Sequence, residues 1–204
     1  MIRITAILLL TIKVGGQLLS HSGKPTHHVI IDTDGAVDDM RSLSMFLSGN
    51  DIRVLAITCS QGTLLPDSVY AKVKTLLTDL HHEGIQISIG HATEKKLPHW
   101  SSFAQAIGWG KTDKKSTGTT VKATHILNKT IENYDEKVTL IALGSLKTYA
   151  DWIQTNPERV NKIEQIIWYN NHDINNGFNY KAWPESYHFI KQTGIELAIV
   201  ENNT

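Results

Sequence analysis

Short apolar runs rich in β-branched residues alternate with longer amphipathic stretches along most of this chain. This alternation is typical of parallel βαβ units. Several of the runs are apolar on both faces, as a parallel sheet covered on each side by helices requires. The sequence therefore predicts an α/β fold with a doubly wound, mainly parallel sheet of about six strands and helices on both faces.

The expected elements follow from the period of the apolar residues. Strands are predicted over 28–32, 52–59, 85–90, 138–144, 163–169 and 195–200. Helices are predicted over 38–47, 66–82, 120–133, 147–156 and 185–192. The stretch 92–118 breaks the pattern and is expected to be a long loop, either a lid or binding loop or a disordered segment. A single domain over 23–204 accounts for these elements.

The first 22 residues differ from the rest. Arg3 is followed by an uncharged apolar stretch over 4–12 and then by Lys13 and small or polar residues. This order predicts a signal peptide, and so an exported protein, periplasmic or secreted. The alternative is a buried strand or helix in a cytoplasmic protein. The stretch is too short for a stable membrane span.

Charge and cysteine content narrow the classes of partner. The chain has 20 basic and 20 acidic residues and no basic stripe, so nucleic acid is not expected as a partner. The only cysteine, Cys59, ends an apolar run and is expected to be a small core residue. A small molecule is the expected partner, and the assembly state is left open, a homo-oligomer included.

An aspartate cluster follows the first expected strand in the stretch "VIIDTDGAVDDM". It contains Asp32, Asp34, Asp38 and Asp39, at the sheet edge where open α/β folds bind ligands. The dipole of the following helix stabilises one or two carboxylates by roughly 0.3–1 kcal/mol each, which does not account for four. A hard cation with oxygen ligands does, so a site for Ca²⁺, with Mg²⁺ also possible, is the favoured interpretation. The alternative is a solvated acidic turn with a helix cap.

Two enzyme families have an aspartate-rich motif of this kind after their first strand. "DTDG" resembles the first motif of haloacid dehalogenase-like phosphatases, in which Asp32 would be the nucleophile and Asp34 the acid/base. "DTDGAVDD" resembles the DTDPGxDD motif of the inosine-uridine preferring nucleoside hydrolases. Three later stretches, "DIRVLAITCSQG", "VTLIALGSLKTYADWIQTNPE" and "GFNYKAWPES", resemble further nucleoside hydrolase segments in the right order. The second resemblance is therefore the stronger, and it covers about 29–200.

The resemblance implies a role for each matching residue. Asp34 would be a metal ligand and the base that takes a proton from the attacking water. Asp39 and the backbone carbonyl of Leu143 would be further metal ligands. Asp38 and Asn179 would bind the hydroxyls of the ribose.

Several positions depart from the family pattern. Gly35-Ala36 replaces Pro-Gly, and Trp183 replaces an aspartate. Thr63 replaces an asparagine and is kept as a candidate substrate contact, while Gly177 replaces a glutamate. Asp32 is expected to support the metal ligands from behind without binding the ion.

Family members continue beyond the position of Thr204, and that part carries a His-Asp pair that completes the metal shell and assists the leaving group. The chain is therefore expected to be a fragment or a shortened relative. His172 and Asp173 are candidate substitutes; the alternative is a plain connector. Trp100 and Trp109 are expected to pack the long loop, with stacking on a base as the alternative.

The expected function is hydrolysis of the N-glycosidic bond of ribonucleosides by a metal-activated water, at full or reduced activity. The alternatives are a phosphatase that uses Asp32 and a non-catalytic domain that binds a sugar or a nucleoside.

Overall fold

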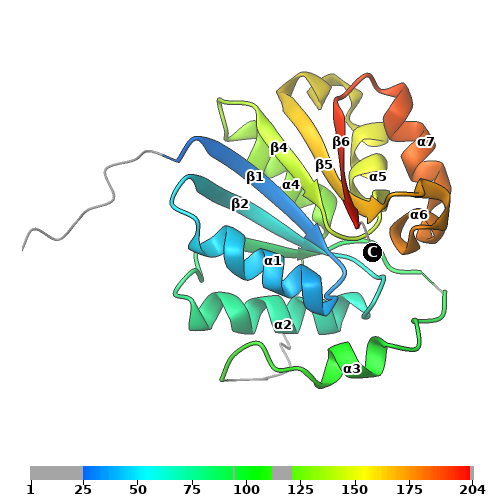
Figure 1. Cartoon of the computed structure of the whole chain (residues 1–204). Coiled ribbons are helices and arrows are strands. Elements are labelled where there is room, and N and C mark those ends of the chain that lie inside the picture. Colours follow the sequence, from blue (N-terminus) through cyan, green and yellow to red (C-terminus); the bar gives the residue numbers. More distant parts are fainter. Residues whose placement is uncertain (1–24, 94, 112–120, 203–204) are drawn as a thin grey trace, which may run out of the picture.

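One parallel sheet organises the molecule. The computed structural model describes residues 25–93, 95–111 and 121–202, so the predicted leader over 1–22 lies outside the described residues. The strand order is β3-β2-β1-β4-β5-β6, and all neighbouring strands are parallel (Figure 1). The strands are β1 (His27–Thr33), β2 (Ile52–Cys59), β3 (Gln86–Ile89), β4 (Val138–Ala142), β5 (Ile163–Asn171) and β6 (Leu197–Asn202). The predicted fold class and the six expected strands are confirmed.

Helices connect the strands and cover the sheet. The α-helices are α1 (Val37–Ser48), α2 (Pro66–Asp79), α3 (Ser101–Ala106), α4 (Ala123–Glu132), α5 (Lys147–Thr155), α6 (Phe178–Ala182) and α7 (Pro184–Gln192). Two 3₁₀ turns are η1 (Pro157–Lys162) and η2 (Ile174–Asn176). The five predicted helices are present with slightly different ends. None of the helices in the described ranges is long and apolar enough to cross a membrane.

Two short helices, α3 and α6, were not predicted. Helix α3 lies inside the expected loop over 92–118, of which residues 94 and 112–118 are outside the described residues. The Lys72 ammonium of α2 donates to the carbonyl oxygens of Gln105 and Ile107, at 2.9 and 2.6 Å. These bonds satisfy carbonyls at the end of α3 that have no partner within the helix. Because the donor lies far away in sequence, local periodicity did not reveal this helix.

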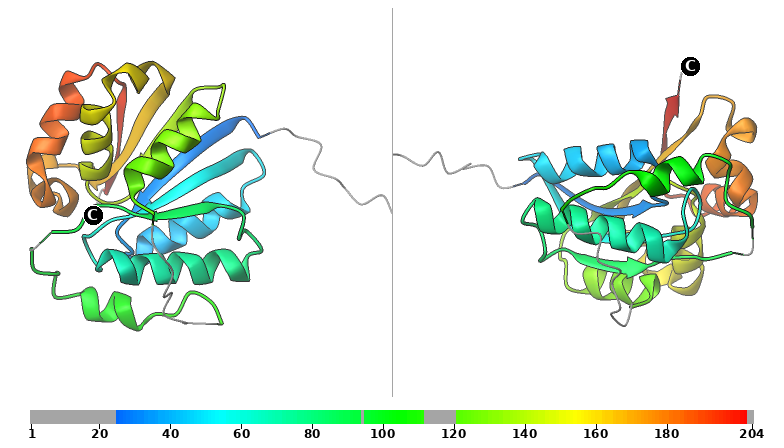
Figure 2. Two further views of the ribbon diagram at one scale, coloured as in Figure 1. Left: turned by 180° about the vertical axis from the view of Figure 1, so that it is seen from behind. Right: turned by 90° about the horizontal axis from the view of Figure 1, so that it is seen from below.

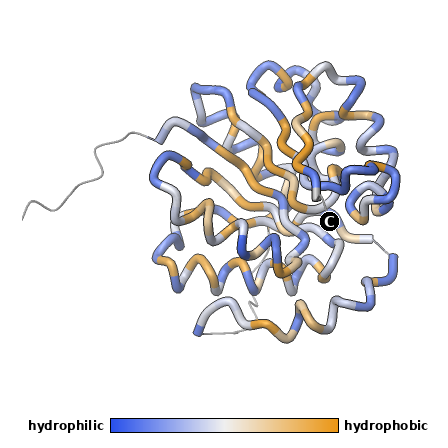
Figure 3. Tube along the Cα trace, viewed as in Figure 1, coloured by the Kyte–Doolittle hydropathy of each residue, from blue (hydrophilic) through white to orange (hydrophobic). Residues whose placement is uncertain are grey.

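The helices form a layer on each side of the sheet. Helix α1 lies in front of β1 and β2 in Figure 1, and α4 and α5 come to the front in the reversed view of Figure 2. The apolar residues concentrate between these layers (Figure 3). One buried cluster packs under α1 and α2, and a second packs under α4, α5 and α7. Cys59 belongs to the first cluster and is fully buried, as predicted.

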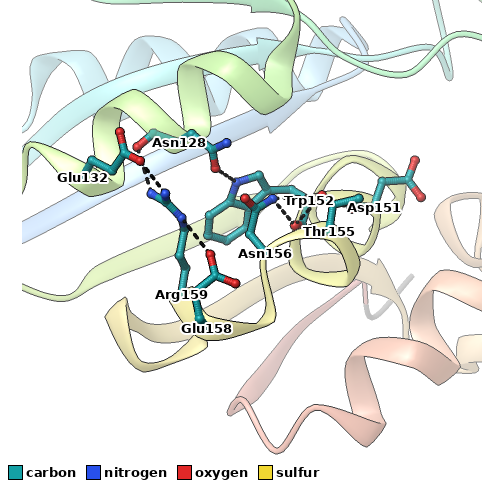
Figure 4. Close-up of polar contacts among 8 residues, drawn as sticks. All are labelled: Asn128, Glu132, Asp151, Trp152, Thr155, Asn156, Glu158 and Arg159. Carbon is teal, nitrogen blue, oxygen red and sulfur yellow. Dashed lines mark hydrogen bonds and ion pairs between the residues drawn. The ribbon is translucent and has the colours of Figure 1, made fainter.

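A polar network fixes α4, α5 and η1 to one another (Figure 4). The Trp152 indole donates to the side chain of Asn128 at 2.8 Å. Arg159 of η1 pairs with Glu132 of α4 and with Glu158. The α4–α5 layer is therefore held by directional bonds as well as by apolar packing.

The strand order creates a crevice at the centre of the sheet. The chain runs from β1 outward to β2 and β3, then returns to β4 on the other side of β1. Connections therefore leave β1 and β4 in opposite directions, and the space between their carboxyl ends stays open. Ligands of doubly wound folds bind at such a switch point.

Candidate functional site

A cavity of about 230 Å³ opens at this switch point. Its walls come from the segments that follow β1, β2 and β4, from the end of β5, and from the starts of α3 and α6. The lining residues are Asp34, Ala36, Asp38, Asp39, Thr63, Trp100, Leu143, Tyr169, Asn170, Asn171, Phe178 and Asn179. Six of the seven predicted site residues therefore line one cavity, and only Asp32 does not.

Asp34 occupies a space kept free by two glycines. A Cβ atom added to Gly62 would lie 2.1 Å from Asp34 Oδ2, and one added to Gly144 would lie 3.2 Å from Asp34 Cβ. The carboxylate accepts hydrogen bonds from the backbone of Ala36, at 3.2 Å, and from the backbone and side chain of Thr63. The turn that follows Asp34 depends on Gly35, whose φ of +78° suits a residue without Cβ. Asp34 is thus fixed in position and still faces the cavity.

Asp39 is held against the end of β1 by the first turn of α1. One of its carboxylate oxygens accepts from the Thr33 hydroxyl at 2.9 Å and from the backbone N–H of Asp34 at 3.1 Å. Asp38, the preceding residue, is exposed and lines the cavity. In this turn, the Asp39 carboxylate is therefore buried and the Asp38 carboxylate is accessible.

The buried carboxyl groups resist ionisation. Burial raises the pKa of Asp34 to about 6. Burial, together with the nearby charges of Asp34 and Asp38, raises the pKa of Asp39 well above its ordinary value. A positive charge close to these carboxylates would lower both pKa values, because it favours the ionised form.

Asn179 organises the opposite wall. Its Nδ2 donates to the carbonyl oxygens of Leu143, at 2.8 Å, and Tyr169, at 2.9 Å. An amide nitrogen has two hydrogens, so both are used and Oδ1 is the polar atom left for a ligand. The predicted contact of Asn179 with a sugar must therefore be made through Oδ1, as an acceptor.

Asp32 does not reach the cavity. It is fully buried, and its two carboxylate oxygens accept from the hydroxyls of Thr58 and Ser60 on the segment of β2. Burial raises its pKa to about 7. A nucleophile must contact its substrate, so this arrangement does not favour the phosphatase alternative.

Thr63 and Trp100 meet at the edge of the cavity. The Thr63 hydroxyl bonds to Asp34 and accepts a long bond from the Trp100 indole, at 3.4 Å. The Trp100 ring lies 5.1 Å from the ring of Phe178, and 38% and 37% of these two side chains are exposed. Trp100 therefore packs the loop against Phe178 and Thr63, as expected, and also leaves part of its ring exposed at the cavity. Trp109 does pack against the cluster under α1 and α2, as predicted.

His172 and Asp173 lie away from the cavity. His172 is exposed and pairs with Glu201 at 2.6 Å, and this partner raises its pKa. Asp173 accepts from the side chain of Asn176 at 2.7 Å. The structure therefore does not bring the candidate substitutes, His172 and Asp173, to the cavity lined by Asp34 and Asp39.

The donors that remain fit a hard cation. Asp34, Asp39 and Leu143 line the same cavity and can supply two carboxylates and a backbone carbonyl, and oxygen is the ligand type that Ca²⁺ and Mg²⁺ prefer. Within the described ranges, no three His, Cys, Asp or Glu side chains are grouped as a metal site. These three residues are thus a partial donor set of the right chemistry.

Sequence reasoning missed Tyr169, Asn170, Asn171 and Phe178 as lining residues. The signal was present, since Asn170 and Asn171 end the strand that neighbours β4 and point to the same sheet edge as the aspartates. The carboxyl-end rule applied to every strand would have included them.

The glycine at position 62 gives a first test of this geometry. Gly62→Ala is expected to lower the free energy of unfolding by about 1–3 kcal/mol, because the new methyl group overlaps the Asp34 carboxylate. Gly84→Ala is the matched control, since nothing lies within 4 Å of a Cβ there. Urea denaturation of the two variants measures the difference. Equal stabilities would contradict the described position of Asp34.

Comparison with known proteins places the chain among relatives of one type. A family model described as "Inosine-uridine preferring nucleoside hydrolase" matches residues 29–195. The chain is 24% identical over 184 residues to the pyrimidine-specific ribonucleoside hydrolase RihA of Enterobacter sp. (strain 638), covering 84% of this chain and 58% of that protein. It is 28% identical over 149 residues to the enzyme of the same name from Shewanella baltica, covering 70% and 46%.

Solved structures show the same fold. The plant nucleoside hydrolase PpNRh1 superposes with a TM-score of 0.74 at 22% identity, covering 88% of this chain and 61% of that chain. The inosine-uridine preferring nucleoside hydrolase of Bacillus anthracis gives 0.74 at 20% identity, covering 86% and 66%. The chain thus spans about half to two thirds of the length of these relatives.

Proposed function

Because the chain belongs to the inosine-uridine preferring nucleoside hydrolase family, we propose that it cleaves the N-glycosidic bond of ribonucleosides with water as the nucleophile. The observation that carries this proposal is the placement of Asp34, Asp38 and Asp39 in one cavity at the switch point of the sheet. The relatives named above supply the substrate class.

The cation is part of the proposal. Asp34, Asp39 and the Leu143 carbonyl would hold it, and Ca²⁺ suits an irregular set of oxygen donors better than Mg²⁺. When bound, such an ion lowers the pKa of a water molecule and helps to orient it.

The chain's own residues divide the remaining work. Asp34 takes the proton of the attacking water, since its carboxylate faces the cavity and is fixed by Ala36 and Thr63. Asp38 accepts hydrogen bonds from ribose hydroxyls at the accessible side, and Asn179 Oδ1 accepts from the other side. The negative charge of the buried carboxylates stabilises the positive charge that develops on the sugar in the transition state.

Help for the leaving group is the weak point of the site. Among the described residues that line the cavity there is no histidine, lysine or arginine. A substrate whose leaving group needs no proton therefore gives the most direct readout of bond cleavage by these residues.

A chromogenic riboside tests this function. We expect calcium-dependent release of p-nitrophenolate from p-nitrophenyl β-D-ribofuranoside, at a rate well above that for uridine or inosine, because p-nitrophenolate leaves without a proton. p-Nitrophenyl phosphate is the control for the phosphatase alternative. Ligand binding without any riboside hydrolysis would instead support a non-catalytic nucleoside-binding domain.

Trp100 should contribute to binding of the base. Trp100→Ala is expected to weaken the affinity for uridine and inosine by about three- to tenfold, because an exposed aromatic face at the cavity can stack on a base. Phe103→Ala is the control, since Phe103 is exposed on α3 but does not line the cavity. Calorimetric titration measures both. If wild type and Trp100→Ala bind the nucleosides with equal affinity, Trp100 only packs the loop and does not bind the base.

A further inference from the structure

Gln61, in the segment that follows β2, is buried and bonds to three residues of the segment that follows β3. Its backbone N–H donates to the carbonyl oxygen of His91 at 2.8 Å. Its side-chain Oε1 accepts from the backbone N–H of Thr93 at 2.8 Å, and its Nε2 donates to the carbonyl oxygen of Lys95 at 2.9 Å. Both polar atoms of the amide are therefore used by the backbone of one neighbouring segment.

These bonds join the two segments beyond the ends of their strands. The parallel pairing of β2 and β3 ends at Cys59 and Ile89, and the Gly90 N–H still donates to the Cys59 carbonyl at 2.8 Å. A glutamine amide carries the same kinds of donor and acceptor as a backbone peptide group. Gln61 can therefore satisfy backbone groups that the sheet no longer reaches. Methionine has a similar length but supplies neither bond.

Lys95 fixes the same segment to the opposite side of the cavity. Its ammonium donates to the carbonyl oxygen of Ala182, at the end of α6, and lies 4.5 Å from the centre of the Trp183 ring. A cation at this distance from an aromatic ring is attracted to it. Helix α6 also carries Phe178, which lines the cavity. The segment after β3 is thus tied to the end of β2 on one side and to α6 on the other.

Trp100 comes next on this connection and meets the same two neighbours. Its indole donates to Thr63, which lies close to Gln61 in the segment after β2, and its ring contacts Phe178 of α6. Gln61 and Lys95 are not among the described residues that line the cavity. They can therefore affect a ligand there only through the residues that they hold in place.

We propose that Gln61 is a positioning residue that holds Trp100 at the cavity and so strengthens the binding of a nucleobase. A ligand that must first order a loop loses affinity, and a loop that is already fixed avoids this loss. The effect concerns the base, because Trp100 supplies an aromatic surface and the sugar contacts come from other residues. This inference rests on the proposed function for the identity of the ligand.

Pseudouridine and methyl β-D-ribofuranoside test the proposal in calorimetric titrations with calcium present. Pseudouridine joins its base to the sugar by a C–C bond, so its Kd can be measured whether or not the protein hydrolyses N-glycosidic bonds. The methyl riboside carries the sugar without a base. Gln61→Met is expected to weaken pseudouridine binding by about three- to tenfold, as Trp100→Ala does, and to leave the affinity for the methyl riboside unchanged.

A double variant gives a readout that a purely structural role of Gln61 would not produce. Gln61→Met combined with Trp100→Ala should bind pseudouridine no more weakly than Trp100→Ala alone, because both changes remove the same contact. Gln105→Met is the matched control, since Gln105 is an exposed glutamine on α3 that does not line the cavity. If Gln61→Met does not fold, Lys95→Met at an exposed position replaces it and should show the same selective loss.

The outcomes separate this inference from the proposed function. An unchanged affinity for pseudouridine, an equal loss for both ligands, or a double variant weaker than Trp100→Ala overturns the inference, as does wild-type protein that does not bind pseudouridine. The hydrolase proposal stands in each of these cases if the chromogenic riboside is cleaved. If that riboside is not cleaved and pseudouridine binding depends on Gln61 through Trp100, the inference stands and the hydrolase proposal fails.

Discussion

Asp34→Asn is expected to reduce riboside hydrolysis by about 10²- to 10⁴-fold while making the calcium-free protein more stable at pH 7. The activity falls because asparagine cannot take a proton from water. The stability rises because the substitution removes one of the neighbouring buried charges between Gly62 and Gly144. Initial rates with the chromogenic riboside and urea denaturation in a chelator measure the two effects.

The opposite signs of these effects make the Asp34 experiment decisive. A variant that only misfolds loses activity and stability together. Asp135→Asn is the control, because Asp135 is exposed and does not line the cavity. Full activity of Asp34→Asn would remove Asp34 from the reaction, and a less stable variant would contradict its description as an uncompensated buried charge.

Calcium-free protein is expected to lose stability as the pH rises from about 4 to about 7. Burial raises the pKa of Asp32 to about 7 and that of Asp34 to about 6, and it also raises the pKa of Asp39 well above its ordinary value. The folded chain therefore keeps protons that the unfolded chain has released, so the free energy of unfolding decreases with rising pH in this window. The decrease should amount to several kcal/mol.

Calcium should reverse this trend, because it binds the ionised carboxylates and competes with protons. The increase in Tm on adding calcium is expected to be larger at pH 7 than at pH 5. Urea denaturation over this pH range, with chelator and with calcium, measures both effects. Calcium-free protein that becomes more stable between pH 4 and pH 7 would contradict the raised pKa values.

Much of the fold could be predicted because it depends on local patterns. The β-branched runs give all six strands, since a buried parallel strand must be apolar on both faces. The cluster from Asp32 to Asp39 could be placed at the ligand-binding edge because the carboxyl ends of parallel strands meet there. The end of α2 was predicted too late, at His82 in place of Asp79, because helix ends depend on capping and not on period.

The different positions of the aspartates within the cluster were expected only from the family resemblance, because local sequence patterns do not distinguish them. Asp32 and Asp34 are two residues apart, which in a continuous strand would put them on the same face. The strand ends at Thr33 and the turn at Gly35 redirects the chain, so Asp32 points into the core and Asp34 into the cavity. Gly62 and Gly144 leave space for Asp34, and Trp100 bonds to Thr63. Both arrangements join segments that are distant in sequence, so no local pattern predicts them.

The amide of Asn179 joins two carbonyls near the carboxyl ends of β4 and β5, while the opposite carboxylates come from the segment after β1 and from the first turn of α1. The two walls are therefore remote in sequence and meet only when β1, β4 and β5 are in register. No early folding intermediate and no fragment that stops short of α6 would possess the cavity. Ligand binding therefore requires the complete fold. If a folding step is slow, binding activity should appear only after that step.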